Sequence, residues 1–549
     1  MKRYHLLPAY STPPSPPSMW PAQNPGGVPF LPATGGWAYD SYGGSGRDGA
    51  TGRVTVFFLD DYTAGSAVSA AYPGGYTRIL HGNIEGFAAA SSPKVLIPIK
   101  AGTVQMNSDF RPGNYMDMYM QFAPGNGVLF RQSPPAVSIV YGGATASHQR
   151  YWHADFRVGD DAGGIDPSNR DGGSVGGWDV NGTNLPTHNT WINCNFNWSI
   201  DECIDGYFGG DYYSFLYCVF GESLHKAQNN KGTIVSHGYG PILGDGYRFD
   251  RLDIQRSIFA HLQSRQPLTA TIRLSYANNI VYNPGDPDNN TAIGIQLTVD
   301  YDATTPYSSP MYANILNNMF VKGPNGASSF NAITVDPAGT DPTVRLPTGS
   351  QGYIAGNAVD GWTYATNDSL RTGVWPTGWL QSSEVTAAMP PGWSGNIKAI
   401  GTGTTPNSYS SAEKIAFATL IKNSVGPLPG KRTPADRAGV IAGHCLSKLL
   451  GSGGQGTCVN SVSGTSDPAG WPNTALRFTP NAGGYPSMGS TAVDPFSPGT
   501  AWVSALPLNG SAPDDRILSS GVFSNGLSKA GYTAIEAWGI DQHYYVGGQ

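Results

Sequence analysis

A short apolar core recurs through the middle of the chain, and its spacing limits the possible folds more than any other feature of the sequence. Each core surrounds one apolar anchor residue, and the anchors are Phe156, Phe196, Phe220, Phe259, Val281, Phe320 and Val359. The steps between them are 40, 24, 39, 22, 39 and 39 residues, as if a bare turn of 22 to 24 residues sometimes carries a loop insertion. Repeats of this period are typical of a solenoid, in which each turn contacts only its neighbours.

We therefore predict an all-β fold, a right-handed parallel β-helix. Its turns stack equivalent residues, so the anchors should form one ladder inside the coil, Cys194 should stack on Cys218, and Asn and Gly should occupy the tight corners. A β-sandwich with irregular loops is the alternative. The strands of a sandwich recur about every 8 to 12 residues, which is shorter than the period of this repeat.

Composition excludes several other classes of protein. With 73 Gly and 43 Pro among 549 residues, an all-helical protein is excluded, whereas 39% hydrophobic residues suffice to build a core and argue against disorder. The net charge of -6 and the absence of a basic run argue against a nucleic-acid partner. No apolar window of about eighteen residues occurs, so the sequence predicts no membrane span.

The repeat divides the chain into three parts. Residues 1–36 are rich in Pro, Ser and Gly and are predicted to form an extended arm that serves as an anchor. Residues 37–405 are predicted to form the β-helix catalytic domain. Residues 406–549 are predicted to form a segment of helices and loops that packs on the β-helix.

Two helices are expected in the last part. The capping box Ser410-Ser411-Ala412-Glu413 should open the first helix, and the second should have Thr433 as its N-cap and end at Gly451. The spacing of Cys445 and Cys458 would allow a local disulfide.

The residues that carry chemistry are concentrated between positions 191 and 282. In chain order they are Trp191-Ile192-Asn193, Asp201-Glu202-Cys203-Ile204-Asp205, His225-Lys226, Arg265-Gln266-Pro267 and Asn278-Asn279. In this order and spacing they resemble the site of the pectate lyases of polysaccharide lyase family one.

The resemblance is closest to the bacterial members of that family and covers roughly residues 37 to 538. Trp198-Ser199-Ile200-Asp201-Glu202-Cys203 looks like their Trp-Ser-Thr-Asp-Glu-Cys, and His237-Gly238-Tyr239-Gly240 recurs there too. Ala435-Asp436-Arg437 with Gly470-Trp471-Pro472 resembles their C-terminal covering segment, and Gly531-Tyr532-Thr533 resembles their closing motif.

The resemblance implies calcium-assisted β-elimination from an acidic, uronate-containing polysaccharide. The reaction removes the C5 proton of a sugar, which is acidic only if the adjacent carboxylate is neutralised, and Ca²⁺ bound by oxygen ligands is suited to this. We expect Asp201 and Asp205, with the side-chain oxygen of Asn193, to hold the ion. By resemblance, Arg265 is the base and Lys226 stabilises the enolate-like intermediate. A basic Arg requires a strongly cationic site that lowers its pKa.

Substrate binding is assigned to a second group of residues, Glu202, His225, His237 and Arg273. Two positions depart from the family pattern. Asn193 stands where the family usually has Asp, which removes one negative charge and should weaken calcium binding. Ala270 stands where the family has a second Arg, and Arg273 is the candidate replacement.

The favoured function is therefore a polysaccharide lyase. A non-catalytic carbohydrate-binding or structural virion protein on the same scaffold is the alternative, motivated by Asn193 and Ala270. A glycoside hydrolase that uses paired carboxylates as acid and base is a third hypothesis.

The first residues of the chain bear on where the enzyme acts. A polysaccharide lyase meets its polymer outside the cell, yet residues 1–8 lack the apolar stretch of a secretory signal. We therefore expect an extracellular-acting, bacteriophage tail-associated depolymerase, whose arm binds other tail or baseplate proteins.

Overall fold

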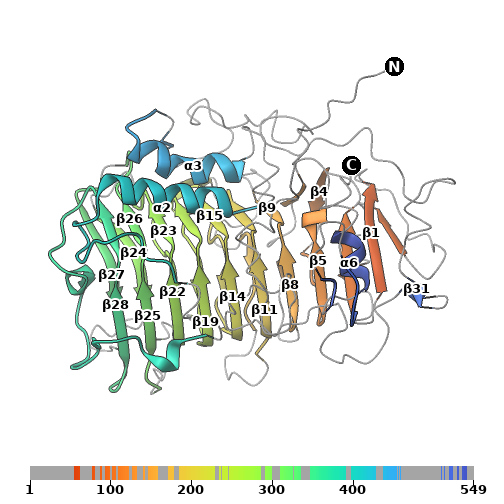
Figure 1. Ribbon diagram of the computed structural model, residues 1–549, viewed down its shortest axis with the longest axis horizontal. Coiled ribbons are helices and arrows are strands. Elements are labelled where there is room, and N and C mark those ends of the chain that lie inside the picture. The colour runs from red at the N-terminus through yellow and green to blue at the C-terminus, as the bar shows by residue number, and fades with distance from the viewer. Residues whose placement is uncertain are drawn as a thin grey trace.

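The structure is a computed structural model of the chain. It describes residues 55–61, 77–80, 87–88, 508–509, 512–513, 518–522, 528–530 and 534–540, and residues 93–458 apart from gaps at 99–101, 107–108, 123–126, 133–139, 142–145, 159–170, 178–184, 229–233, 237, 245, 286–290, 300–308, 326, 336–345, 391–396, 428–436, 454 and 457. The described strands wind into a right-handed parallel β-helix (Figure 1), which confirms the predicted fold class. The predicted arm, residues 1–36, lies outside the described residues.

Three parallel sheets build the coil, and successive turns add strands to each of them. In spatial order, sheet A contains β2 (Thr77–Leu80), β1 (Thr55–Asp61), β3 (Lys94–Pro98), β5 (Met116–Tyr119), β8 (Gln149–Trp152), β11 (Thr187–Ile192), β14 (Asp211–Leu216), β19 (Phe249–Gln255), β22 (Thr271–Ala277), β25 (Tyr312–Leu316) and β28 (Gln351–Ala355). Sheet B contains β4 (Gly102–Met106), β6 (Val128–Gln132), β9 (Asp155–Arg157), β12 (Asn195–Asn197), β15 (Val219–Gly221), β20 (Ile258–Ala260), β23 (Ile280–Tyr282), β26 (Met319–Val321) and β29 (Ala358–Asp360). Sheet C contains β7 (Val140–Tyr141), β10 (Gly173–Ser174), β13 (Asp205–Gly206), β18 (Ile242–Leu243), β21 (Leu268–Thr269), β24 (Thr291–Leu297), β27 (Ser329–Val335) and β30 (Arg371–Thr372).

The predicted anchors are the central residues of the strands of sheet B, and they pair in register from one turn to the next. The pairs are Phe156 with Phe196, Phe196 with Phe220, Phe220 with Phe259, Phe259 with Val281, Val281 with Phe320 and Phe320 with Val359. The rings of Phe196 and Phe220 stack with their centroids 5.5 Å apart, and those of Phe220 and Phe259 are 4.9 Å apart. All are buried, so the predicted internal ladder is confirmed.

Asparagines line the corner between sheets A and B, as predicted. Asn279 Oδ1 accepts a hydrogen bond from the backbone N–H of Ser257, Asn318 Oδ1 from Asn279, and Asn357 Oδ1 from Asn318, each at 2.9 Å. These bonds satisfy backbone groups that the turn removes from the sheets. The same position in two earlier turns is occupied by Cys194 and Cys218, whose thiols contact each other as expected.

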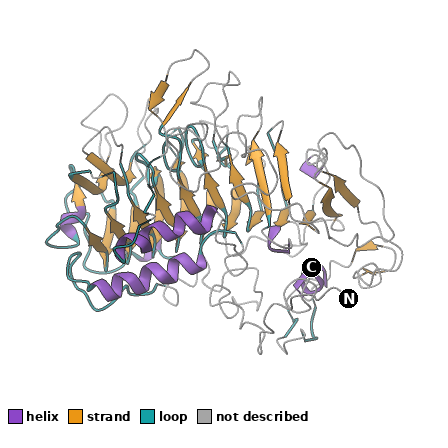
Figure 2. Cartoon of the chain, turned by 90° about the horizontal axis from the view of Figure 1, so that it is seen from above, coloured by secondary structure: helices purple, strands orange, loops and turns teal. Residues whose placement is uncertain are grey.

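Two helices, α2 (Ser411–Ser424) and α3 (Arg437–Leu449), lie side by side against the outer face of sheet B (Figures 1 and 2). Their apolar side chains form one cluster with outward-facing residues of the sheet, namely Val219, Ile258, Ala260, Ile280, Tyr282, Met319, Val321 and Ala358, packed against Phe417, Ile421, Ile441 and Cys445 among others. Sheet B is therefore buried on both faces along the strands β15 to β29 that the helices cover.

The termini of these helices agree with the sequence where they are described. The Ser410 side chain and the Glu413 side chain form the reciprocal capping box predicted for α2. The chain turns at Gly451, with φ of 70°, just after α3, whereas Thr433 lies outside the described residues. Cys445 and Cys458 are both free thiols, so the expectation of a local disulfide was wrong.

The remaining described elements are short. They are α6 (Ala534–Ile540), the 3₁₀ turns η3 (Met120–Phe122), η5 (Asp368–Leu370) and η6 (Thr386–Ala388), and the hairpins β16 (Lys226–Gln228) with β17 (Ile234–Ser236) and β31 (Leu508–Asn509) with β32 (Ala512–Pro513). In the part of the chain that is described, no helix has the length and apolar character needed to cross a bilayer.

Candidate functional site

One row of side chains crosses four consecutive turns at the corner between sheets B and C. Along sheet C, Ser174 pairs with Asp205, Asp205 with Ile242, and Ile242 with Leu268. The residues three positions before these partners are Asp171, Glu202, Tyr239 and Arg265. Neighbouring parallel strands are about 4.8 Å apart, so the coil brings residues from widely separated parts of the sequence within side-chain reach.

Backbone hydrogen bonds hold this row in register. The N–H of Gly172 donates to the carbonyl of Glu202 (3.2 Å), the N–H of Cys203 to Tyr239 (3.2 Å), and the N–H of Gly240 to Ser264 (2.9 Å). A Cβ atom at Gly240 would overlap the carbonyl oxygen of Arg265, so only glycine allows this close approach.

Three buried acidic residues meet in the row. Asp171, Asp201 and Glu202 each place a carboxylate oxygen within 4.8 Å of the other two. Asp171 also accepts a hydrogen bond from the backbone N–H of Glu202 (3.2 Å), which ties adjacent turns together. The sequence predicted Asp201 in this place but not Asp171.

Asp205 lies next to this cluster, at the start of β13. Burial and the neighbouring charge of Asp201 raise the pKa of Asp205 to about 7, while a hydrogen bond with Ser174 acts in the opposite direction. The Oδ1 atom of Asp205 also accepts from the backbone N–H of Tyr207 (2.8 Å). The two aspartates predicted from the sequence therefore interact electrostatically across one corner.

Arg265 reaches the acidic cluster from two turns away. Its guanidinium forms an ion pair with the carboxylate of Glu202 and lies 4.3 Å from the ring centroid of Tyr239, the residue of the intervening turn. Its side chain is 24% exposed, and its backbone N–H donates to Oε1 of Gln296 (2.8 Å). The structure thus brings Arg265 together with Asp201 and Glu202, and the assignment of Glu202 to substrate binding stays a prediction.

Asn193 does not belong to this site. It occupies the corner between β11 and β12, one strand before Asp201, and its amide nitrogen donates to the carbonyls of Ser424 (2.6 Å) and Gly426 (3.1 Å) at the end of α2. A strand of sheet B separates the two corners, because Asn193 precedes β12 and Asp201 follows it. The expectation that Asn193 completes a calcium half-shell with Asp201 and Asp205 is therefore corrected.

Arg273 is also distant from the cluster in the topology. It lies in β22 of sheet A, is paired with Arg251 and Tyr312 in register, and forms an ion pair with Asp250. Ala270, where the family has its second arginine, is buried. The structure does not bring Arg273 into the site as a replacement for that arginine.

The remaining sequence candidates lie near the hairpin β16–β17. His225 is buried directly before β16, and Gly238 packs against its backbone, where a Cβ would lie 2.9 Å from the Cα of His225. Lys226 begins the hairpin, but its side chain lies outside the described residues, as does the whole of His237. Their assigned roles stay predictions.

Asp171 is the residue that sequence reasoning missed. The strand that follows it, β10, has only two residues, and the segment between Asp171 and the preceding anchor Phe156 is long, so no apolar run indicated a turn there. The equivalence of Asp171 and Glu202 follows from the pairing of Ser174 with Asp205 in adjacent turns, which only the structure shows.

The donor set suits a hard divalent cation. All the clustered ligand atoms of Asp171, Asp201 and Glu202 are carboxylate oxygens, and oxygen ligands are what Ca²⁺ prefers. Buried carboxylates that crowd together need a compensating positive charge, of which Arg265 supplies one. The residues present therefore fit Ca²⁺.

Comparisons with known proteins find similarity only at the level of structure. No family model matches the sequence, and no curated protein matches it. Jun a 1, the major allergen from cedar pollen, matches with a TM-score of 0.42 and 12% identity over 71% of this chain and 92% of its own. Pectate lyase II from Xanthomonas campestris matches with a TM-score of 0.34 and 13% identity over 73% and 99%. A pectate lyase from Bacillus sp. N165, in complex with trigalacturonate, matches with a TM-score of 0.31 and 12% identity over 70% and 98%.

Proposed function

We propose that the chain is a polysaccharide lyase that cleaves a uronate-containing polysaccharide by calcium-assisted β-elimination. The observation that carries this proposal is the convergence of Asp171, Asp201, Glu202 and Arg265 on one row of consecutive turns. Carboxylates that hold a cation and a guanidinium beside them are the groups that elimination from a uronate requires.

Asp171, Asp201 and Glu202 would hold Ca²⁺, with Asp205 close by. When bound, the ion would neutralise the carboxylate of the substrate and thereby make its C5 proton acidic. Asn193 takes no part in this set, because its amide is used at the end of α2.

Arg265 is the residue proposed to take the C5 proton. The electron pair of the C5–H bond forms the C4–C5 double bond, the C4–O bond breaks, and the leaving oxygen takes up a proton. In the arrangement described, the carboxylate of Glu202 favours the protonated guanidinium. The base role therefore requires the Arg265–Glu202 pair to open when substrate binds, and the ring of Tyr239 supports the guanidinium plane meanwhile.

An absorbance assay tests the reaction. The full chain is incubated with polygalacturonate and with uronate-containing bacterial capsule, with Ca²⁺ or with a calcium chelator, and the ultraviolet absorbance of the unsaturated product is followed. A lyase produces absorbance that the chelator removes. New reducing ends without absorbance would instead indicate the glycoside hydrolase hypothesis, in which water is the nucleophile or attacks an intermediate.

A carbohydrate-binding protein without catalysis is the second candidate. It is favoured by the ion pair that engages Arg265 with Glu202 and by the position of Arg273 on sheet A. Affinity electrophoresis against the same polysaccharides separates the candidates, because a binder is retarded by a polymer that it leaves uncleaved.

For the location we propose an extracellular site of action on a bacteriophage tail, with residues 1–36 as the arm that contacts tail or baseplate proteins. The support is the composition of residues 1–36 and the need of a lyase to meet its polymer outside the cell. Incorporation of a variant that lacks residues 1–36 into virions would contradict the proposed anchor.

A further inference from the structure

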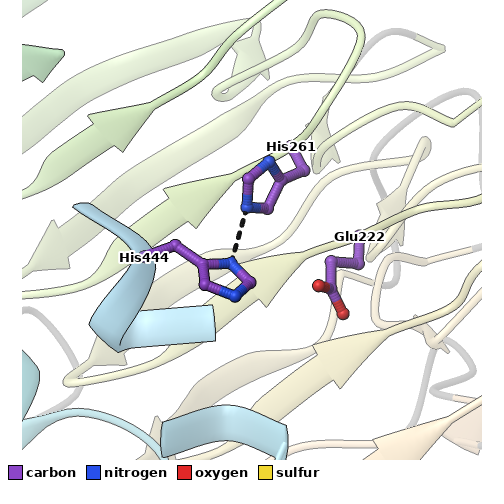
Figure 3. Close-up of side chains that lie close together, drawn as sticks. All are labelled: Glu222, His261 and His444. Atoms are coloured by element: carbon purple, nitrogen blue, oxygen red, sulfur yellow. Dashed lines mark hydrogen bonds between the residues drawn. The ribbon is translucent and has the colours of Figure 1, made fainter. Parts of the chain in front are cut away.

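We propose that Glu222, His261 and His444 form a second metal site, for a divalent transition-metal ion of the zinc type, where α3 meets the coil. The three side chains are buried, with exposed fractions of 0%, 0% and 7%, and their ligand atoms lie within 4.8 Å of one another (Figure 3). The proposal does not rest on the lyase function, since none of the three belongs to the row around Arg265.

The coil itself aligns two of the ligands. Glu222 directly follows β15 and His261 directly follows β20, and Gly221 pairs with Ala260 in register. The backbone N–H of Glu222 donates to the carbonyl of Ala260 (2.9 Å). Glu222 and His261 are thus equivalent residues of adjacent turns, both with positive φ (55° and 60°), and the corner presents their side chains together.

The third ligand comes from α3. Ile441 and Cys445 of this helix pack in the apolar cluster over sheet B, which fixes the helix against the coil. His444, on the same helix, then places its Nδ1 atom 2.9 Å from Nε2 of His261 (Figure 3). Two imidazole nitrogens and one carboxylate from three separate segments of chain converge on one small volume.

The donor types identify the class of ion. Imidazole nitrogen with carboxylate oxygen suits zinc and related transition metals, whereas Ca²⁺ takes oxygen ligands only. Three protein ligands leave one position of a tetrahedral ion for water. A cation at this position would also be attracted to the carboxylate of Glu222, which is fully buried.

Gly456 leaves space beside the two ring nitrogens. A Cβ atom at this position would clash with Nδ1 of His444 and lie 2.7 Å from Nε2 of His261. The chain after α3 passes over His261 and His444 at Gly456, where φ is 64°. Because glycine has no Cβ atom, the space beside the two ring nitrogens stays open.

Asn283 contacts the second ring nitrogen of His261, the one that does not face His444. Its amide nitrogen lies 2.8 Å from Nδ1 of His261, while its Oδ1 accepts from the backbone N–H of Asn325 (2.9 Å). An amide that donates to Nδ1 places the imidazole proton on Nε2, which then donates to His444. Metal binding at Nε2 moves that proton to Nδ1, where it needs an acceptor. An aspartate at position 283 would accept from both Nδ1–H and Asn325, so Asn283→Asp should strengthen metal binding.

Titration with the metal alone tests the site. The full chain is freed of metal with a transition-metal chelator and titrated with ZnCl₂ by calorimetry, and bound zinc is counted by elemental analysis. We expect one ion per chain in the wild type, at least about a 100-fold weaker affinity in His261→Gln and His444→Gln, and about a 10-fold stronger affinity in Asn283→Asp. Substoichiometric zinc in the wild type, or unchanged affinity in both His variants, would show that the two rings form only a hydrogen-bonded pair.

Two controls keep the result specific. His188→Gln removes a histidine of β11, on sheet A, and should bind zinc like the wild type. Asp201→Asn should bind zinc with the affinity of the wild type even if it alters calcium dependence, which separates this site from the proposed calcium site.

Hydrogen exchange gives a second readout. Circular dichroism of each metal-free variant establishes folding, and zinc should then protect the amides of α3 from exchange in the wild type but not in His444→Gln. Equal protection of α3 by zinc in both proteins would overturn the proposal.

Discussion

The guanidinium of Arg265 contacts the carboxylate of Glu202 across the ring of Tyr239, so three consecutive turns of the coil meet in one interaction. The contact arises because the three residues hold equivalent positions before the strands of sheet C. The site is therefore a product of the register of the coil rather than of any one loop. Changes in this row should therefore affect the proposed chemistry.

Arg265→Ala should lower the rate of product formation by about 10² to 10⁴, the usual contribution of a general base. The fold should persist, because the Arg265 side chain is partly exposed. Arg273→Ala is the matched control, since this arginine pairs with Asp250 on sheet A, and its rate should stay within about twofold of the wild type. The initial rate of ultraviolet absorbance on a cleaved uronate polymer measures both variants. Full activity in Arg265→Ala contradicts the assignment of the base.

Asp171→Asn should raise the calcium concentration needed for half-maximal activity by about 10-fold or more, because it removes one of three clustered carboxylates. The measurement is a calcium titration of activity, repeated with Asp201→Asn. Two ordinary calcium curves from these variants would exclude the cluster as the ion site.

Asn193→Ala should leave the calcium titration unchanged and reduce the free energy of unfolding by about 2 kcal/mol, since two buried carbonyls at the end of α2 lose their donor. Asn193→Gly is the control for the backbone, because φ at this residue is 53° and alanine adds roughly 1 kcal/mol of strain there. Denaturant unfolding of the three proteins gives the comparison. Weaker calcium binding in Asn193→Gly would restore the role expected from the sequence.

Phe220→Ala should cost about 3 to 5 kcal/mol of the free energy of unfolding, because it leaves a cavity between the stacked rings of Phe196 and Phe259. Phe220→Leu should cost less, because leucine fills most of the space. Denaturant midpoints of the two variants test this. A cost for alanine no larger than that for leucine would mean that the ladder contributes little.

The capping box of α2 should make the first turn of that helix sensitive to acid. Hydrogen bonds from Thr402 and Ser410 lower the pKa of Glu413 from 4.5 to about 2. A carboxyl whose pKa is lowered on folding stabilises above the pKa of the unfolded state, and the contribution is lost as the pH falls from about 4.5 towards 2. Hydrogen exchange of α2 should show this loss in the wild type and a flatter pH dependence in Glu413→Gln. The same pH dependence in both proteins would remove Glu413 as the cause.

The sequence predicted those features that depend on neighbours in one turn or in adjacent turns. The Phe156 to Val359 anchors and the Asn279 corner repeat at the period of the coil, so their contacts follow from spacing alone. The order of Asp201, Asp205 and Arg265 in the sequence likewise predicted that these residues lie together at one corner of the coil. The sequence-based position of Asn193 beside Asp201 differs from the structure because β12, a strand of sheet B, lies between them and carries the chain from one corner of the coil to the next.

The amino-acid sequence by itself determined the parallel coil, its internal ladder and the cap of α2, because each is a local pattern of side chains. Only the tertiary structure decided which corners the C-terminal helices cover. Asn193 meets Ser424 across 231 residues and His261 meets His444 across 183. No local pattern encodes such contacts, since they depend on how α2 and α3 pack their apolar faces on the outer surface of sheet B.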